Sequence, residues 1–439
     1  MAYTHHPIQR LLCNLQESEK LSKNEWWIRP AILDGRCQRC NQLVSSEYQL
    51  PNGVIYCPHC IQFGRLTNQQ YLCSKKNIST VTKAQAQCTW EGSLTIYQQK
   101  IADGLKHCLK NHHHALVWAV TGAGKTEMLF PLILTFLKQG KRVAISSPRI
   151  DVCLELYPRI SQAFAKEDVC LMYGKSKEEY REKSFVVCTT HQLVHFYRAF
   201  DLLIIDEIDA FPYEGDEMLH FASKQSLKLD GMQVLLTATP PNPLIKKVTA
   251  DHSWEVLKLP IRFHQRPLLV PKLIFNEYCD DLTSHPIAFH RFLKLVEYLS
   301  KKWHVLVFCP SIAYTKILCS QTKKFLPKIK MTDVSAIAPN RPLKVEKLRR
   351  HEYEIFFTTT ILERGVTIDE VAVVVVAAQH KVFTKSALVQ IAGRADRKGK
   401  NINGEVYFLL NEYSLAVKQA CQEIKDMNEL AKKVKMNVL

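Results

Sequence analysis

Long hydrophobic runs are missing from this sequence of 439 residues. No apolar signal region follows Met1, and the longest apolar run, at residues 371–378, is far shorter than the ~20 residues needed to cross a bilayer. The cysteines number 15, an odd count, and many lie in apolar segments, where a thiol behaves as a small hydrophobic group. In the absence of a secretory signal, this pattern favours a protein of the reducing cytoplasm.

Acidic residues are in deficit. Asp and Glu number 42 against 59 Lys and Arg, which gives a formal net charge of +17. Residues 251–439 hold 30 basic and 19 acidic side chains, so +11 of the excess lies in that part. A polyanion such as nucleic acid, or an anionic membrane surface, is the expected partner. The alternative is a basic surface that serves solubility alone.

One glycine is absent from a stretch that otherwise has the composition of a phosphate-binding loop. Residues 119–126 read AVTGAGKT, with Ala119 where such loops usually begin with glycine. An apolar run precedes the loop at residues 116–118 and a helix-like segment follows at 127–138, as the motif requires. Small residues let backbone N–H groups face phosphate oxygens, and the helix N-terminus adds positive charge. The residues expected to hold the phosphates are Thr121, Gly122, Ala123, Gly124, Lys125 and Thr126.

Two side chains of this loop and two later carboxylates predict a nucleoside triphosphatase. Lys125 would reach the β- and γ-phosphates, and the Thr126 hydroxyl would bind Mg²⁺. Taken alone, the loop also fits an ordinary turn with a solvated lysine. The apolar run at 202–205, typical of a strand buried on both faces, ends in Asp206 and Glu207. Carboxylates there lie where open α/β sheets bind ligands, so Asp206 would hold Mg²⁺ and Glu207 would serve as general base.

Four cysteines form two closely spaced pairs, Cys37 with Cys40 and Cys57 with Cys60. This spacing predicts a four-thiolate zinc site. Protein ligands fill all four positions, which makes the site structural rather than catalytic. The segment between the pairs, residues 48–56, is broken by Pro-Asn-Gly and indicates a hairpin. We expect this zinc module at about residues 31–65, within an N-terminal region of residues 1–93.

A first lobe is expected at residues 94–250. Strand-like runs at 143–147, 185–188 and 234–236 leave room for crossover helices, and each ends in a polar cluster that suits phosphates of a nucleotide or a nucleic-acid strand. Gln98, ahead of the first strand, carries an amide that can pair with both the N6 donor and the N7 acceptor of adenine. The residues of this half expected to contact nucleic acid are Pro148, Arg149, Thr189, Thr190 and His191.

Proline-rich residues 251–284 indicate a linker, and a second α/β series occupies residues 285–439. It lacks a phosphate loop but has Thr358 and Thr359 after a strand-like run, where they would contact nucleic acid, and two arginines, Arg394 and Arg397. From a facing lobe, such arginines would stabilise charge on the γ-phosphate, although an isolated pair more often forms surface salt bridges. The predicted fold is α/β, with two tandem RecA-like parallel-sheet lobes behind a small four-cysteine zinc-binding domain.

The ordered motifs resemble those of superfamily 2 helicases. They run from Gln98 through the phosphate loop and the acidic motif to Thr237-Ala238-Thr239, residues 358–365 and residues 390–397. The last motif usually has glycine where Asp396 stands. The phosphate loop, with Glu127 directly after it, resembles that of PriA-type helicases. Those proteins carry their zinc cysteines inside the second lobe. The module ahead of the first lobe, with DEIDAFP at 206–212 and RFHQRP at 262–267, resembles instead the ComFA family of late-competence DNA translocases.

This resemblance implies the remaining parts of the site and the partners. Gly365 and Asp369 would complete the nucleotide site, and the cofactors would be ATP, Mg²⁺ and Zn²⁺. ComFA proteins imply an ATPase that single-stranded DNA stimulates, at the inner face of the cell membrane. There it would associate with the ComFC protein and the ComEC channel and draw transforming DNA into the cytoplasm during natural competence. The sequence does not distinguish a monomer from a homo-oligomer.

Three functions remain open at this stage. The first is an ATP-driven single-stranded DNA translocase. The second is a PriA-like replication-restart helicase or another enzyme that unwinds DNA or RNA duplexes. The third is a zinc-bearing nucleic-acid-binding adaptor without catalysis, which predicts the loss of at least one of Lys125, Glu207, Arg394 or Arg397; all four are present.

Overall fold

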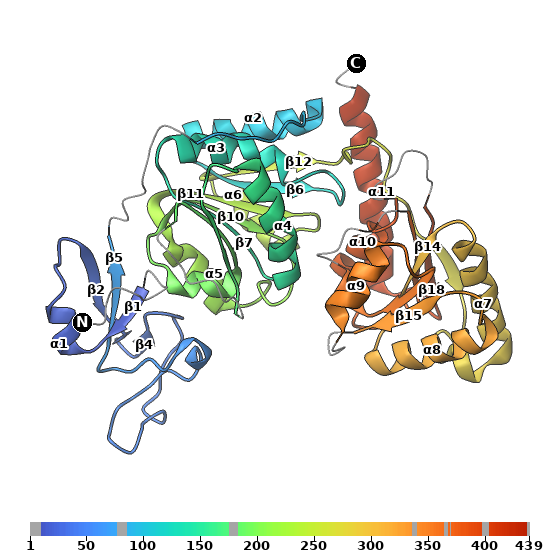
Figure 1. Cartoon of the computed structure of the whole chain (residues 1–439), viewed down its shortest axis with the longest axis horizontal. Coiled ribbons are helices and arrows are strands. Elements are labelled where there is room, and N and C mark those ends of the chain that lie inside the picture. Colours follow the sequence, from blue (N-terminus) through green and yellow to red (C-terminus); the bar gives the residue numbers. More distant parts are fainter. Residues whose placement is uncertain are drawn as a thin grey trace. The chain divides into compact units, whose positions relative to one another are not determined.

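The chain folds into two compact units (Figure 1). The structure, a computed structural model, describes residues 10–76, 86–174, 183–335, 340–363, 368, 370–396 and 404–436. The first unit extends to Trp118 and continues over Lys125–Lys258. The second comprises Ala119–Gly124 and the chain from Leu259 onward. The six residues at the start of the phosphate loop therefore belong, by their contacts, to the second unit.

The N-terminal part of the first unit is a small antiparallel module. Its three-stranded sheet has the order β1-β5-β2, and a two-stranded ribbon pairs β3 with β4. The segment that links the two cysteine pairs forms the expected hairpin, because Tyr56 N donates to Tyr48 O at 3.0 Å and Leu50 N donates to Val54 O at 2.8 Å. The elements are β1 (Arg10–Cys13), α1 (Leu15–Glu19), β2 (Trp26–Pro30), β3 (Ile32–Leu33), β4 (Arg36–Cys37) and β5 (Tyr71–Lys75).

A seven-stranded sheet forms the core of the first unit, with the order β12-β6-β11-β10-β7-β9-β8. The strands from β6 to β8 in this order pair in parallel, as their continuous apolar runs predict. The strands are β6 (His114–Ala119), β7 (Val143–Ser147), β8 (Val169–Met172), β9 (Phe185–Thr189), β10 (Phe200–Asp206), β11 (Leu227–Thr237) and β12 (Trp254–Leu259).

Helices cover both faces of this sheet (Figure 1), with α2 and α3 on one side and α5 on the other. α3 packs on β10 and β7 through an almost wholly apolar sequence, whereas α5 packs on β11. Burial on both faces explains why β10 reads as a continuous apolar run. The helices are α2 (Ile96–Lys110), α3 (Phe130–Lys138), α4 (Ile150–Ala163), α5 (Glu217–Ser226) and α6 (Asn242–Ala250).

The second unit is built on a six-stranded parallel sheet with the order β13-β18-β17-β14-β16-β15. The two parallel sheets together confirm the predicted pair of RecA-like lobes. The strands are β13 (Lys272–Phe275), β14 (His304–Phe308), β15 (Met331–Val334), β16 (Ile355–Thr358), β17 (Val371–Val375) and β18 (Val406–Leu410). The helices are α7 (Pro286–Ser300), α8 (Ile312–Phe325), α9 (Arg341–Arg349), α10 (Lys385–Ala392) and α11 (Leu415–Met436).

The expected linker at residues 251–284 contains regular structure. β12 within it is an edge strand of the first sheet, and β13 is an edge strand of the second. Its prolines lie mainly between these two strands, where a residue without an N–H removes no ladder hydrogen bond. Among the described residues, no helix combines the length and the apolar character that a membrane span requires.

Candidate nucleotide site and four-cysteine centre

The phosphate loop begins where β6 ends. Gly122 and Gly124 have φ values of 76° and 72°, a conformation that side chains disfavour. Ala119 is the last residue of β6 and is fully buried. Because its backbone is that of a strand, a methyl group is compatible with the place where the usual motif has glycine. The loop continues into the 3₁₀ turn η2 (Glu127–Leu129) and then α3, as predicted.

The acidic motif lies at the same edge of the sheet as this loop. β6, β11 and β10 are neighbouring parallel strands, so Thr126 and Asp206 leave the sheet at its carboxyl edge. Asp206 ends β10, and its Oδ1 accepts a hydrogen bond from Glu207 N at 2.9 Å. Glu207 has a φ of 56°, an unusual value for a residue with a side chain. The arrangement supplies the hydroxyl and carboxylate oxygens that Mg²⁺ prefers.

Asp209 connects the acidic motif to the next strand. Its carboxylate is buried and accepts a 2.7 Å hydrogen bond from Thr237 Oγ1, and a second one from Thr239 Oγ1. Sequence reasoning grouped these two hydroxyls with those suited to phosphate contacts, whereas the structure directs them to a carboxylate. Only the pairing of β10 with β11 brings the two motifs together. Two charge-assisted hydrogen bonds therefore join the acidic motif to the Thr237-Ala238-Thr239 motif.

Gln98 occupies the first turn of α2. The Gln98 side-chain Oε1 accepts a hydrogen bond from Thr95 N at 2.9 Å, and the Gln98 backbone N–H donates to Thr95 Oγ1 at 3.3 Å. This reciprocal pair of hydrogen bonds is a capping box. The T-x-x-Q pattern is a known sequence signal for it, but adenine recognition was the only role considered for Gln98 from the sequence. The recognition of adenine by Gln98 stays a prediction.

The second unit contributes the arginine of the last motif. Arg394 follows the C-cap of α10, Gly393, and is buried. Its Nε donates to Glu363 O at 3.0 Å, which fixes the guanidinium against the turn after β16. Arg397, Gly365 and Asp369 lie outside the described residues. The expected roles of these three residues stay predictions.

The expected nucleic-acid contacts also follow strands, but they differ in exposure. Thr189 ends β9, Thr190 begins the 3₁₀ turn η3 (Thr190–His195), and Thr358 ends β16; all three are buried, as is Pro148. Three residues of the set remain partly exposed: Arg149, His191 and Thr359. Burial lowers the pKa of His191, against the opposing effect of Asp216, so this imidazole is neutral at pH 7.

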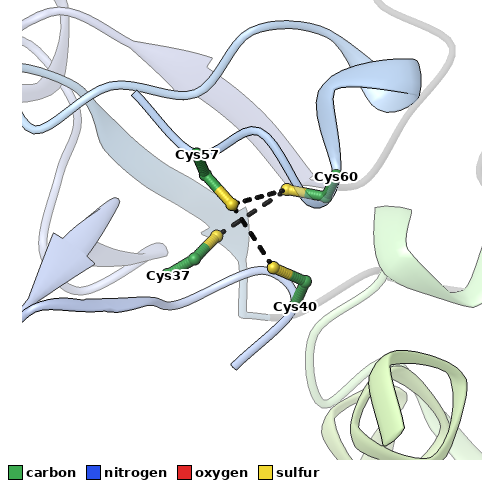
Figure 2. A group of neighbouring side chains, drawn as sticks. All are labelled: Cys37, Cys40, Cys57 and Cys60. Atoms are coloured by element: carbon green, nitrogen blue, oxygen red, sulfur yellow. Dashed lines mark hydrogen bonds between the residues drawn. The ribbon is translucent and has the colours of Figure 1, made fainter. Parts of the chain in front are cut away.

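The four cysteines converge on one point (Figure 2). The Sγ atoms of Cys37 and Cys60 lie 3.7 Å apart, those of Cys40 and Cys57 3.5 Å, and those of Cys57 and Cys60 3.7 Å. Disulfide sulfurs lie about 2 Å apart, so these pairs are thiols. A tetrahedral ion with bonds of about 2.3 Å requires sulfurs roughly 3.8 Å apart, and the observed spacing fits zinc.

Arg39 adds a buried positive charge to this centre. Its Nε and one terminal nitrogen each donate to Cys60 Sγ at 3.2 Å, while its remaining contacts go to the carbonyls of Cys60, Phe63 and Gly64. Four thiolates around Zn²⁺ carry a net charge of −2, and a buried guanidinium offsets part of it. This residue lies inside the first C-x-x-C pair, and sequence reasoning gave it no role.

The cysteine module is attached to the first sheet next to η3. Arg10, on β1, donates to Val194 O at 3.1 Å and to Gln225 Oε1 at 3.1 Å. The Phe63 ring meets the His195 ring edge-on at 5.7 Å. Together with the cysteines, Leu66 and Leu72 belong to the same hydrophobic cluster as the core around β9 and β10. The module therefore packs directly against the rest of the first unit.

Comparisons with known proteins agree with this geometry. The family described as DEAD/DEAH box helicase matches residues 95–248, and the helicase conserved C-terminal domain matches residues 289–399. A solved structure, DEAD-box helicase Mss116 bound to ssRNA and UDP-BeF, has a TM-score of 0.57 and 16% identity, covering 75% of this chain and 77% of its own. At that identity, this likeness shows the fold alone.

Two curated relatives are similar along nearly the whole chain. Competence protein ComFA of Streptococcus pneumoniae is 40% identical over 405 residues, which cover 90% of each chain. ComFA of Bacillus subtilis is 36% identical over 406 residues, covering 91% of this chain and 87% of its own. Both helicase domains are present and in order. The chain therefore belongs to the ComFA family of competence proteins, and it is an ATP-hydrolysing enzyme of the superfamily 2 helicase and translocase type.

Proposed function

We propose that this protein moves along single-stranded DNA at the expense of ATP and thereby powers the uptake of transforming DNA. The observation that carries the proposal is the likeness to ComFA over 90% of the chain. The partly exposed Arg149, His191 and Thr359, each next to the carboxyl end of a parallel strand, support it. A motor needs such contacts on two sheets, since movement requires two grips on the strand.

In this proposal, the first sheet holds ATP and prepares water for attack. Lys125 neutralises charge on the β- and γ-phosphates, and Thr126 and Asp206 hold Mg²⁺. Bound Mg²⁺ withdraws charge from the γ-phosphate. Glu207 takes the proton of the attacking water. Arg394 and Arg397 stabilise the charge that develops as the γ-phosphoryl group leaves.

The strand contacts grip phosphates and leave the bases unread. The Arg149 guanidinium, the neutral His191 imidazole and the Thr359 hydroxyl are all donors to phosphate oxygens. Because such contacts carry no sequence information, binding is largely sequence-independent. The excess of +11 in residues 251–439 adds a diffuse attraction, so affinity falls steeply with salt.

We also propose that the four-cysteine centre holds one structural Zn²⁺. The spacing of the sulfurs and the buried Arg39 support this assignment. Cys37, Cys40, Cys57 and Cys60 fill all four tetrahedral positions, so the centre cross-links the module and leaves no place for substrate.

A direct test compares ATP hydrolysis with and without single-stranded DNA at moderate salt. We expect DNA to accelerate hydrolysis, and RNA of equal length to do so less. In the double variant Arg149→Ala/Thr359→Ala, the DNA stimulation should fall several-fold while hydrolysis without DNA is unchanged, because neither side chain belongs to the nucleotide motifs. Unchanged stimulation would show that Arg149 and Thr359 serve only surface pairing and helix capping. Efficient unwinding of a blunt duplex would favour a restart-type helicase instead.

Family likeness extends the proposal to partners. We propose that the protein acts at the inner face of the cell membrane, next to the ComFC protein and the ComEC channel. The basic residues 251–439 suit the anionic cytoplasmic surface. Vesicles that carry ComEC should co-sediment the protein more strongly than empty vesicles of the same lipids. Equal sedimentation would contradict a specific association.

A further inference from the structure

The last helicase motif departs from its usual sequence at Asp396, and the structure gives the reason. Asp396 has a φ of 54°, in the left-handed region where glycine is the ordinary choice. Asparagine and aspartate tolerate this conformation better than other side chains, yet still at a cost in free energy. The Asp396 side chain is also only 2% exposed. A buried carboxylate in a strained position requires compensation from its surroundings.

Two arginines of the RFHQRP segment supply that compensation. Arg266 donates through Nε to Asp396 Oδ2 at 2.8 Å, and one of its terminal nitrogens lies 2.8 Å from Oδ1. Arg262, only 1% exposed, places a terminal nitrogen 3.5 Å from Oδ2. A buried guanidinium is stable only with a carboxylate or several acceptors nearby. Asp396 thus supplies a counter-ion that a glycine there would not.

The same segment also holds the backbone of this turn. Arg262 donates from its other terminal nitrogen to Ala395 O at 2.9 Å. His264 Nδ1 accepts from Arg266 N at 3.2 Å, so the ring proton is on Nε2, which donates to Asp396 O at 3.1 Å. Burial, followed by Arg262 and Arg266, lowers the pKa of His264, in agreement with this neutral tautomer. Residues 393–396, here named the arginine turn, are therefore fixed through three side chains.

On its other side, the segment meets the phosphate loop. Phe263 N donates to Gly122 O at 3.0 Å, and Val120 N donates to Leu259 O at 3.1 Å. A Cβ placed on Gly122 would lie 3.3 Å from Arg262 Nε, so the guanidinium rests against the bare backbone of the loop. The loop also contacts the arginine turn directly, because a Cβ on Gly393 would lie 2.0 Å from Thr121 Oγ1.

We propose that Arg262 and Asp396 are positioning residues for ATP hydrolysis. Their ion pair holds the phosphate loop and the arginine turn in one arrangement, so that the loop amides and Arg394 face the same phosphoryl group. Arg394 lies two residues before Asp396, and a shift of the turn displaces both. The inference rests on the proposed roles of the phosphate loop and Arg394 in ATP hydrolysis and is independent of the proposed DNA contacts.

The experiment measures ATP turnover and nucleotide binding in Arg262→Gln and Asp396→Asn, both without DNA. Asp396→Asn keeps the size of the side chain, Arg262→Gln shortens it but keeps a polar group, and each removes the charge. Since a displacement of about 1 Å can cost a hundredfold in rate, we expect kcat to fall by about tenfold or more. The dissociation constant of an ATP analogue should change less than about threefold, because Lys125 and the loop amides remain. Near-normal kcat in folded variants would overturn the proposal.

Two further variants keep the test decisive. Lys272→Met breaks a 2.6 Å ion pair with Glu405 at the edge of the same sheet, between β13 and β18, and should leave kcat unchanged. Arg266→Gln removes the more exposed partner of Asp396 and should lower kcat by a smaller factor than Arg262→Gln does. This variant can be measured even if Asp396→Asn fails to fold. In the double variant Arg262→Gln/Asp396→Asn, kcat should be no lower than in the more impaired of the two single variants. Independent, multiplying effects would show that the two side chains do not act as a pair.

Discussion

The four-cysteine centre and the nucleotide site are assembled in opposite ways. All four cysteines come from one short stretch, Cys37 to Cys60, and their sulfurs contact one another, with Arg39 donating to Cys60 Sγ. Among the described residues, those assigned to ATP come from the first turn of α2, the loop after β6, the end of β10 and the turn after α10. The first centre is closed, because protein thiols occupy all four tetrahedral positions. The second depends on segments that lie far apart in the sequence.

Removing charges from the nucleotide site should have the largest effect on activity. Lys125→Ala deletes the cation at the β- and γ-phosphates, and Glu207→Gln removes the general base but keeps its shape. We expect both to lower ATP turnover by at least about 10³-fold, since hydrolysis depends almost wholly on positioning and electrostatics. Glu207→Gln should still bind a fluorescent ATP analogue, whereas Lys125→Ala should bind it weakly. More than a tenth of normal turnover in Glu207→Gln would disprove the assignment of the base.

The closed centre should respond to mutation in its own region alone. In Cys37→Ala/Cys60→Ala, bound zinc should fall from about one ion per chain to none, because two thiolates cannot hold the tetrahedral ion against water. Hydrogen exchange should rise across the zinc module, residues 31–65. Basal ATP turnover should stay within about threefold of normal, because in the part of the chain that the structure describes the hydrogen bonds of the four cysteines stay within the N-terminal module. The matched control is Cys421→Ala, a buried thiol outside the centre, which should keep its zinc.

The same difference decides which features could be predicted from the sequence alone. Local patterns were sufficient for the two C-x-x-C pairs, for the apolar run that becomes β10, and for the phosphate loop between β6 and α3. Contacts between distant segments were not visible. Asp209 meets Thr237 only because β10 pairs with β11, and Asp396 meets Arg262 across more than a hundred residues. Asp396 and the RFHQRP segment both stand out in the sequence. Their spacing, however, does not predict that Asp396 forms ion pairs with the arginines of that segment.

Tyr197 forms part of the contact between the N-terminal module and the first sheet. The Arg29 guanidinium lies 3.6 Å from the centre of the Tyr197 ring, and Trp27 meets that ring edge-on at 6.2 Å. Burial, and then the nearness of Arg29 and Arg39, lower the pKa of Arg10 to about 9, so Arg10 is still charged at pH 7. Crowded cations repel, and the negative face of a buried ring offsets part of that repulsion.

The smallest predicted effect is the removal of this ring. Tyr197→Leu should weaken the docking of the module by about 1–2 kcal/mol, because it deletes a cation–π contact and an aromatic pair. Tyr197→Phe, which keeps the face of the ring, should cost little. Protease cleavage between the module and the first sheet reports the docking, while bound zinc and basal ATP turnover should stay normal in both variants. If Tyr197→Leu lost zinc, the closed centre would depend on the sheet beneath it, and the contrast drawn between the two regions would fail. If instead Phe and Leu weakened docking equally, the hydroxyl rather than the ring would hold the module.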